Sequence, residues 1–300
     1  MIVVKLIGGL GNQMFQYAIG RHLAIINQQP LLLDISAYKA CSDRYYALDC
    51  FNIRATIAHK INAEQFRQNG QFLTFVEKIK YQFFPSLRKR LIKEPHFHYS
   101  PDIIKSYEYS IYLEGYWQSE KYFLPIREQL LQDFTLAQPL SEPNRLLAEH
   151  IGSVESVSIH VRRGDYVSNP IANACHGTCE SSYYQQAIEK IASMVSNPFF
   201  FVFSDEPQWF AENVDMHYPY VVVAHNQGRQ SYNDLHLMRL CKHNIIANSS
   251  FSWWGAWLNT NPKKVVIAPR QWFNPNSKWF KEWDLATATA DLVPPEWIRI

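Results

Sequence analysis

The chain has 300 residues, of which 47% are hydrophobic and 19% charged, and its 29 basic and 27 acidic residues give a net charge of +2. A chain of this length can bury a large core and divide into two domains. The nearly balanced charge argues against the broad cationic surface that generic nucleic-acid binding requires, so we expect no nucleic-acid partner.

Apolar runs and cysteines bear on location. Residues 1–7 form a short apolar run closed by glycines, unlike a signal peptide, and no later run approaches the roughly 20 apolar residues of a membrane helix. The five cysteines form an odd set without paired C-x-x-C units, which is typical of reduced thiols. We therefore expect a cytoplasmic protein, either free or peripheral to the inner membrane face. Cys175, His176 and Cys179 are crowded enough to consider a metal, but a fourth ligand has no evident source, so no metal site is predicted.

The first half opens with a strand–helix–strand pattern. The expected elements are a strand at residues 3–7, a tight loop at 8–13, a helix at 14–26 and a second strand at 31–33 ending in Asp34. The loop resembles a dinucleotide-binding loop, but Met14 stands where that pattern has the third glycine that lets the helix pack close to its strand. Asn12 and Gln13 are better suited to hydrogen-bonding a polar ligand or the facing domain.

The rest of the first half is less regular. Residues 41–133 are rich in aromatic and basic side chains, most cationic at residues 83–90, and no elements are predicted there. Residues 138–143 (QPLSEP) have the composition of a linker. We place the domain boundary in this segment, with one α/β domain at residues 1–140 and another at 141–300.

The second half alternates strands and helices. Strands are expected at residues 157–161, 199–203, 220–224, 244–247 and 265–268, and helices at 182–194, from 207, at 232–241 and at 251–258. Repeated βα units predict a parallel sheet covered on both faces. Polar clusters follow four of the strands, at the edge where such sheets bind ligands: residues 162–163, 204–206, 225–226 and 248–250.

Two arginines follow the strand at residues 157–161. Side chains alternate along a strand, so His160 and Arg162 share one face while Arg163 points to the other. Arginine is suited to bidentate recognition of phosphate, and the segment therefore indicates a phosphorylated ligand. From these residues alone, an equally strong alternative is that both arginines pair with carboxylates such as Asp165.

Ser249 and Ser250 precede residues 251–258, which are apolar nearly all round and so predict a buried helix. Backbone N–H groups at its amino end, together with a serine hydroxyl, would bind an anion. An ordinary serine N-cap explains the same residues, and the two interpretations are compatible. Trp253 and Trp257, spaced i and i+4, are expected in the core rather than as sugar-stacking surfaces.

Three segments together carry a resemblance to a known family: residues 8–17 (GGLGNQMFQY), 160–166 (HVRRGDY) and 248–255 (NSSFSWWG). In this order they resemble the α-1,2-fucosyltransferases of glycosyltransferase family 11. The resemblance implies an α/β fold of two Rossmann-like domains of GT-B type with parallel sheets. It also implies transfer of L-fucose from GDP-fucose, with inversion, to the 2-hydroxyl of a terminal β-galactose in a glycan, either free or lipid-linked. Residues 1–140 would then be the acceptor-side domain and residues 141–300 the GDP-fucose-binding domain.

The resemblance also implies roles for single residues. In more distantly similar fucosyltransferases a His-x-Arg at the strand end contacts the donor diphosphate, and it corresponds to His160 and Arg162. Their nucleoside-holding Asp corresponds to Asp234, which its spacing after Ser231 would otherwise mark as a helix cap. Their phosphate-contacting Ser corresponds to Ser250. We group four further residues with these donor-binding candidates: Arg163, Ser249, Gly11 and Asn12.

The expected mechanism follows from charge. Cleavage of the bond from fucose C1 to the diphosphate leaves a developing dianion, which fixed donors such as Arg162 stabilise. Enzymes that place a divalent cation here hold it with paired aspartates, and the sequence contains no Asp-x-Asp. We therefore expect metal-independent transfer, with no cofactor besides the donor substrate GDP-fucose. Asp165, Asp34 and His176 are the candidates for the base that accepts the galactose proton.

Two other classes of protein fit parts of the sequence. A nicotinamide-dependent oxidoreductase would use the first strand–helix–strand unit, and a carbohydrate-binding module would use the aromatic residues, which make up 15% of the chain. Both explain the paired arginines poorly. A fucosyltransferase that forms another linkage is the nearer alternative.

Overall fold

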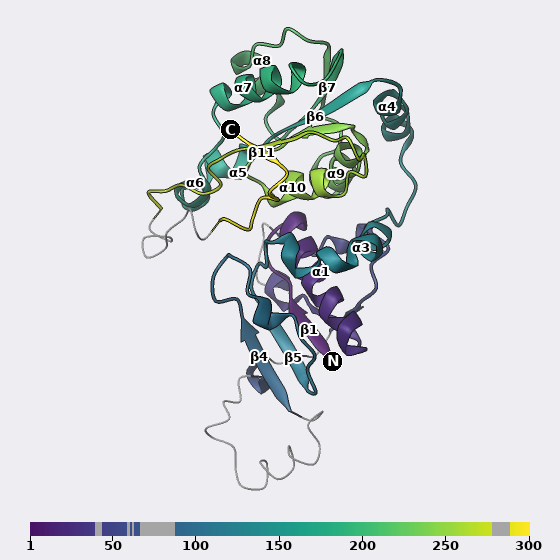
Figure 1. Ribbon diagram of the computed structural model, residues 1–300, viewed down its shortest axis with the longest axis vertical. Helices are drawn as coiled ribbons and strands as arrows, with labels where there is room; N and C mark the ends of the chain where they lie inside the picture. Colours follow the sequence, from purple (N-terminus) through teal and green to yellow (C-terminus); the bar gives the residue numbers. More distant parts are fainter. Residues whose placement is uncertain (40–43, 59–60, 62, 67–87, 278–288) are drawn as a thin grey trace. The chain divides into compact units, whose positions relative to one another are not determined.

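The structure is a computed structural model that describes residues 1–39, 44–58, 61, 63–66, 88–277 and 289–300, without the side chain of Asp165. The chain forms two compact units, Met1–Ala137 (unit 1) and Gln138–Ile300 (unit 2). Each unit contains its own parallel sheet and helices (Figure 1). The predicted α/β class, with two Rossmann-like units that each contain a parallel sheet, is confirmed. No helix among the described residues is long and apolar enough to cross a membrane.

Unit 1 is built on a five-stranded sheet of order β3-β2-β1-β5-β4, in which every pair is parallel. Its strands are β1 (Ile2–Lys5), β2 (Leu31–Asp34), β3 (Thr56–Ile57), β4 (Lys89–Lys93) and β5 (Ser110–Glu114). Its α-helices are α1 (Leu10–Asn27) and α3 (Arg127–Asp133), and its short 3₁₀ helices are η1 (Ser36–Lys39), η2 (Leu48–Cys50), η3 (Ala63–Phe66), η6 (Pro101–Ile103), η7 (Glu120–Tyr122) and η8 (Leu124–Ile126).

Helix α1 packs unusually close to the sheet at Gly20. A Cβ atom at this position would lie 2.4 Å from Val4 Cγ2 and 2.8 Å from Leu31 Cδ1, so only glycine fits without a shift of its neighbours. The third glycine of the dinucleotide-binding pattern, which lets a helix pack close to its strand, is absent at Met14. Gly20, further along the same helix, allows this close packing instead.

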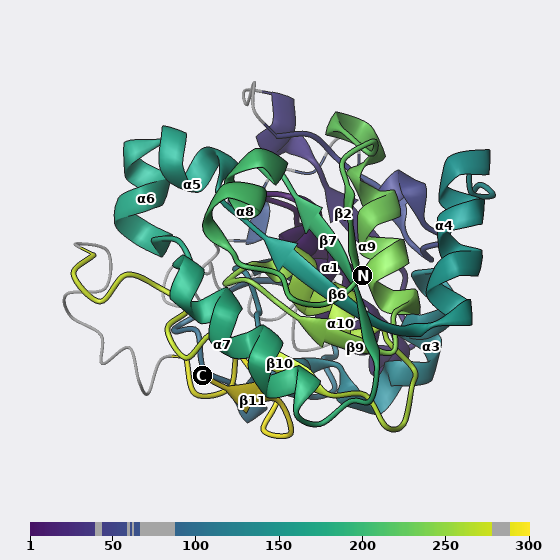
Figure 2. The same ribbon diagram turned by 90° about the horizontal axis from the view of Figure 1, so that it is seen from above.

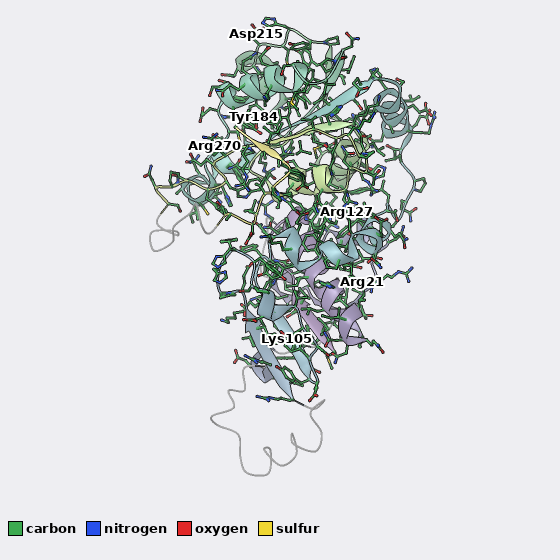
Figure 3. The ribbon with its side chains drawn as sticks, in the orientation of Figure 1. Arg21, Lys105, Arg127, Tyr184, Asp215 and Arg270 are labelled. Atoms are coloured by element: carbon green, nitrogen blue, oxygen red, sulfur yellow. The ribbon has the colours of Figure 1, made fainter. Side chains whose placement is uncertain are left out.

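A buried carboxylate joins α3 to α1. Asp133 Oδ2 accepts a hydrogen bond from the Tyr17 hydroxyl at 2.6 Å and another from Arg21 Nε at 2.8 Å. Arg21, labelled in Figure 3, extends from α1 toward α3. A buried charge with several charge-assisted hydrogen bonds holds one geometry, so this group fixes the end of unit 1 before the chain enters unit 2.

Unit 2 is built on a six-stranded parallel sheet of order β11-β10-β9-β6-β7-β8. Its strands are β6 (Glu155–Val161), β7 (Pro198–Ser204), β8 (Tyr220–Val223), β9 (His243–Ile245), β10 (Val266–Ala268) and β11 (Ile298–Arg299). Its helices are α4 (Glu142–Ser153), α5 (Gly164–Ser168), α6 (Pro170–His176), α7 (Ser181–Ala192), α8 (Pro207–Asn213), η9 (Gly228–Ser231), α9 (Tyr232–Leu240) and α10 (Ser250–Trp257).

Helices cover both faces of this sheet, as predicted (Figures 1 and 2). Val157, Ile159 and Val161 of β6 pack in one core cluster with apolar residues of α7 and α8. Tyr184 of α7, labelled in Figure 3, is fully buried in this cluster. The intervening β6 residues lie on the other face, where Asn244 of β9 donates to Ser158 Oγ at 2.7 Å and to the carbonyl oxygen of Met238 in α9 at 2.9 Å.

The strand order places a ligand edge in each unit. Counted along the chain, the strands of unit 2 follow the order 3-2-1-4-5-6 of dinucleotide-binding folds, whose direction of winding reverses between the first and fourth strands, here β6 and β9. In unit 1 the corresponding reversal lies between β1 and β5. Open parallel sheets bind ligands at the carboxyl ends of the strands beside such a reversal.

Several local predictions were wrong. Helix α1 begins at Leu10, so residues 10–13 belong to the helix and only the residues before it form the loop, where Gly8 has a positive φ of 78°. Helices α4, α5 and α6 were not predicted. Residues 83–87 of the basic stretch lie outside the described residues, whereas residues 89 and 90 belong to edge strand β4.

Candidate functional site

The ligand edge of unit 2 brings together the segments that follow β6 and β9. The rings of His160 in β6 and Phe251 in α10 lie 5.6 Å apart between centroids. Tyr166 of α5 donates a hydrogen bond to the carbonyl oxygen of Asn248 at 3.5 Å. The arginine-bearing and serine-bearing segments, which were expected at one sheet edge, are thus neighbours.

Both arginines pair with carboxylates that follow β7. Arg162 Nη1 lies 2.7 Å from Asp205 Oδ2, and Arg163 Nε lies 3.1 Å from Glu206 Oε2. Asp205 Oδ1 also accepts the backbone N–H of Arg163 at 2.9 Å. The sequence had suggested Asp165, whose side chain lies outside the described residues. A guanidinium has five N–H donors, so pairing with Asp205 and binding of a phosphate are compatible.

The two arginines have different surroundings. The Arg163 guanidinium stacks on the Trp209 ring at 4.0 Å from its centroid, and the Arg162 guanidinium lies 5.4 Å from the centroid of Tyr166. Tyr166 stacks in turn on His176, with ring centroids 4.6 Å apart. Arg163 is therefore packed against α8, whereas Arg162 forms the end of a stack at the ligand edge.

His160 is buried and neutral. Burial and the charge of Arg162 lower the pKa of His160 to about 3. Its Nδ1 atom has no hydrogen-bond partner among the described residues. A neutral imidazole offers one donor and one acceptor but no charge, so His160 can contribute hydrogen bonding and packing at this edge but not a positive charge.

Helix α10 carries the serine cluster. Ser249 Oγ accepts the backbone N–H of Phe251 at 3.3 Å, which confirms the predicted N-cap. Trp253 and Trp257 are buried with their rings stacked, which confirms their predicted place in the core. The amino end of α10, with Ser250 as its first residue, is therefore rigidly supported and presents partial positive charge at the ligand edge.

Asp234 is not the helix cap that its spacing suggested. Ser231 has helical backbone angles and makes no side-chain cap, because the 3₁₀ helix η9 runs directly into α9. Instead, Asp234 Oδ1 accepts a hydrogen bond from Asn226 Nδ2 at 2.8 Å. The pKa of Asp234 is raised to about 7, because the effect of burial is larger than the opposing effect of the hydrogen bond from Asn226. A half-buried carboxyl group that serves no cap is a candidate for binding a ligand.

The cysteines near this edge do not form a metal site among the residues that the structure describes, where no three His, Cys, Asp or Glu side chains gather. Cys179 is buried, and its thiol lies 3.6 Å from Asn248 Oδ1. Burial raises the pKa of Cys179 to about 12, which keeps it a thiol rather than the thiolate that a metal requires.

Unit 1 has a polar group at its own ligand edge. Asn12 Oδ1 of α1 accepts a hydrogen bond from Gln118 Nε2 at 2.8 Å, which joins the segments after β1 and β5. Gly11 is buried in the first turn of α1. Gln13 is fully buried and bonds to the carbonyl oxygens of Gly8 and Tyr45, so its expected role in contacting a ligand is wrong and its role is structural.

A carboxylate that sequence reasoning missed holds the segment after β5. Glu94 accepts the backbone N–H groups of Tyr116 at 2.7 Å and Trp117 at 2.8 Å. Trp117 is buried with a positive φ of 59°, a strained conformation for a non-glycine residue. Burial raises the pKa of Glu94 to about 7. The only sequence signal was its place directly after β4 in a segment where no elements were predicted.

The candidates for the base differ in their surroundings. Asp34 is buried, and its two oxygens accept hydrogen bonds from the Tyr112 hydroxyl at 2.5 Å and the Ser36 N–H at 2.8 Å. These bonds assign Asp34 to the structure of unit 1. His176 lies at the ligand edge of unit 2, between the rings of Tyr166 and Phe273. Asp165 stays a prediction.

Two units with parallel sheets of Rossmann type place the chain in the class of α/β proteins that bind their ligands at the carboxyl ends of the strands. Within that class, the chain belongs to glycosyl transferase family 11, whose family model matches residues 1–299. It is 35% identical to the alpha-1,2-colitosyltransferase of Escherichia coli over 100% of this chain and 99% of that protein. It is 28% identical to galactoside alpha-(1,2)-fucosyltransferase 2 of Pongo pygmaeus over 97% of this chain and 80% of that protein.

Among solved structures, the chain is similar to the NodZ alpha-1,6-fucosyltransferase soaked with GDP-fucose, with a TM-score of 0.48 and 12% identity over 89% of this chain and 94% of that one. Family membership identifies the chain as a glycosyltransferase. It therefore displaces the nicotinamide-dependent oxidoreductase and the carbohydrate-binding module that were weighed from the sequence.

Proposed function

We propose that the protein transfers a 6-deoxy-L-galactose sugar from its GDP ester to the 2-hydroxyl of a β-galactose in a glycan, with inversion and without a metal ion. The observation that carries this proposal is the neighbourhood of Arg162 and the amino end of α10 at the switch point of unit 2. The names of the two relatives support the 1,2-linkage, and the fucosyltransferase supports galactose as the acceptor.

The donor diphosphate is assigned to unit 2. As the bond from the sugar C1 to the diphosphate breaks, negative charge grows on the leaving oxygen. Arg162, held by Asp205, and the N–H groups at Ser250 supply fixed positive charge there. Arg163 and Ser249 support these two groups through ion pairing and capping. This arrangement can take the place of a cation held by paired aspartates, which the sequence lacks.

Sugar recognition is assigned to unit 1. The Asn12–Gln118 pair presents amide groups, which suit neutral hydroxyls. In the same unit, Phe97 and Tyr116, which lies two residues before Gln118, stack with centroids 6.0 Å apart, and aromatic surfaces of this kind favour the apolar faces of sugars. We therefore assign Asn12 to the sugar part of the donor or to the acceptor galactose, and the nucleotide to Asp234.

The relatives leave two donors to distinguish, because colitose is fucose without its 3-hydroxyl. A direct test supplies GDP-fucose and GDP-colitose separately, each with a panel of β-galactosides, in excess chelator. We expect transfer to a terminal galactose, with 1,2-linkage found by linkage analysis of the product. Activity that disappears in chelator and returns with magnesium or manganese would contradict the metal-free part. A product linked elsewhere than at the 2-hydroxyl would contradict the assigned linkage.

A further inference from the structure

A chain of buried amides runs from helix α4 to the carboxylate of Asp234. Asn144 of α4 and Asn226, which follows β8, exchange two hydrogen bonds of 2.8 Å between their side-chain amides. Asn226 Nδ2 also donates to Asp234 Oδ1 at 2.8 Å. Asn144 Oδ1 additionally contacts His225 Nε2 at 2.8 Å, and Asn144 Nδ2 donates to Ser141 Oγ at 3.1 Å.

Packing of α4 against α9 does not by itself require hydrogen-bonded side chains at the contact. Asn144 is 1% exposed and Asn226 is 6% exposed, so two amides have been removed from water at the contact where apolar side chains would pack equally well. Buried polar groups are favourable only when their partners are correctly placed, and such networks fix a single geometry. The geometry fixed here is that of the Asp234 carboxylate.

The orientation of this carboxylate matters for a guanine base. Guanine presents two adjacent donors, the N1–H and the 2-amino group, and a carboxylate accepts both only when its two oxygens lie in the plane of the base. The bond from Asn226 to Oδ1 sets the rotation of the Asp234 carboxylate. No hydrogen bond to Oδ2 is found among the described residues, so this oxygen can accept a further N–H group.

We propose that Asn144 and Asn226 are positioning residues that hold Asp234 in the orientation that distinguishes guanine from bases without a 2-amino group. This inference rests on the proposed function, since it assumes that the donor is a GDP-sugar. Neither asparagine need touch the nucleotide. The two asparagines act by orienting the Asp234 carboxylate. Their replacement should therefore change the ratio of affinities for different nucleotides more than the affinity for nucleotides in general.

Titration of the full-length protein with GDP and with IDP, which lacks the 2-amino group, tests this inference. In the wild type we expect GDP to bind roughly 10- to 100-fold more tightly than IDP, as for loss of a hydrogen bond to a charged group. In Asn226→Ala and in Asn144→Ala, the ratio of the two dissociation constants should fall to within about threefold of unity. Two variants are used so that poor folding of one does not prevent the test.

Asn259→Ala is the matched control. Asn259 is also buried, and it donates to Asn244 Oδ1 and to the Cys241 carbonyl oxygen, in a hydrogen-bond group separate from Asp234. Its replacement should lower the melting temperature and leave the GDP/IDP ratio unchanged. A ratio that stays at the wild-type value in both Asn144→Ala and Asn226→Ala would overturn the positioning role alone. Absence of GDP binding by the wild type would overturn the proposed function as well.

Discussion

Arg162 is the residue whose replacement tests the charge mechanism most simply. Lysine keeps the charge but cannot reproduce the fork of N–H donors that pairs with Asp205 and, in the proposed function, would also hold a phosphate. We expect both Arg162→Lys and Arg162→Ala to lower kcat by about 10²–10³-fold, the usual loss for one such donor. Steady-state kinetics with saturating acceptor measures this loss. A lysine variant with wild-type kcat would show that the guanidinium geometry is unimportant.

Arg163 provides the contrast to Arg162. Its guanidinium packs on Trp209 and pairs with Glu206, so its contribution belongs mainly to folding. Arg163→Ala should reduce the free energy of unfolding by about 1–2 kcal/mol and so lower the melting temperature by roughly 2–8 °C. Thermal unfolding checks this expectation. An unchanged melting temperature, together with a loss of kcat equal to that of Arg162→Ala, would refute the division between the two arginines.

Asp234 predicts how nucleotide binding depends on pH. Its pKa is raised to about 7 in the free protein, and the ionised form is the one that accepts N–H groups of guanine. As pH falls below 7 the competent fraction falls, so guanosine affinity should drop about tenfold between pH 8 and pH 6. Guanosine is the probe because it has no phosphate to titrate. Asp234→Asn should bind weakly and show a flat profile; a wild-type profile that is equally flat would contradict the assignment.

At the scale of single elements, α1 shows how packing sets a local requirement. A methyl group at Gly20 would press on Val4 and Leu31, so Gly20→Ala should destabilise the protein by about 1–3 kcal/mol. Gly152 of α4 is the matched control, because a Cβ there meets nothing within 4 Å. Gly152→Ala should be neutral or stabilising by up to about 1 kcal/mol. Denaturant unfolding measures both, and equal effects of the two substitutions would argue against the close packing of α1.

The elements that could be predicted from sequence were those with a continuous apolar run. The strands of unit 2 are buried on both faces, and β6 and β7 therefore appeared as runs of valine, isoleucine and phenylalanine. Helices α5 and α6 were missed because they are short and half-exposed, although Asn169 caps α6 and Pro170 follows it, a recognisable start signal. Helix α4 was hidden by the proline at its first turn, which was interpreted as part of a linker.

The candidate site could be predicted only in part. Arg162 and the serines before α10 follow strands, so their shared edge was predictable from alternation along the chain. The partners Asp205 and Asn226 were noted only as polar clusters, because no sequence pattern specifies which side chains meet across a sheet edge. Asn144 carried no signal, and Glu94 only its place directly after β4, since a single buried amide or carboxylate resembles any surface residue in the sequence.

The two units of the molecule are suited to different parts of the substrates. Each unit has its own winding reversal and so its own ligand edge, with the Arg162–Asp205 pair in unit 2, and the Asn12–Gln118 amides beside the Lys5–Glu114 ion pair in unit 1. Charge suits the diphosphate and amides suit hydroxyl groups. We therefore assign the nucleotide to unit 2 and sugar recognition to unit 1.

Calorimetric titration of GDP into the wild type, Asp234→Ala and Asn12→Ala tests this assignment of the nucleotide to unit 2. We expect Asp234→Ala to bind GDP at least about tenfold more weakly than the wild type, as for loss of hydrogen bonds to a carboxylate. Asn12→Ala should bind GDP with nearly wild-type affinity and yet transfer sugar more slowly. The contradicting result is loss of GDP binding in Asn12→Ala with affinity retained in Asp234→Ala, which would place the nucleotide in unit 1.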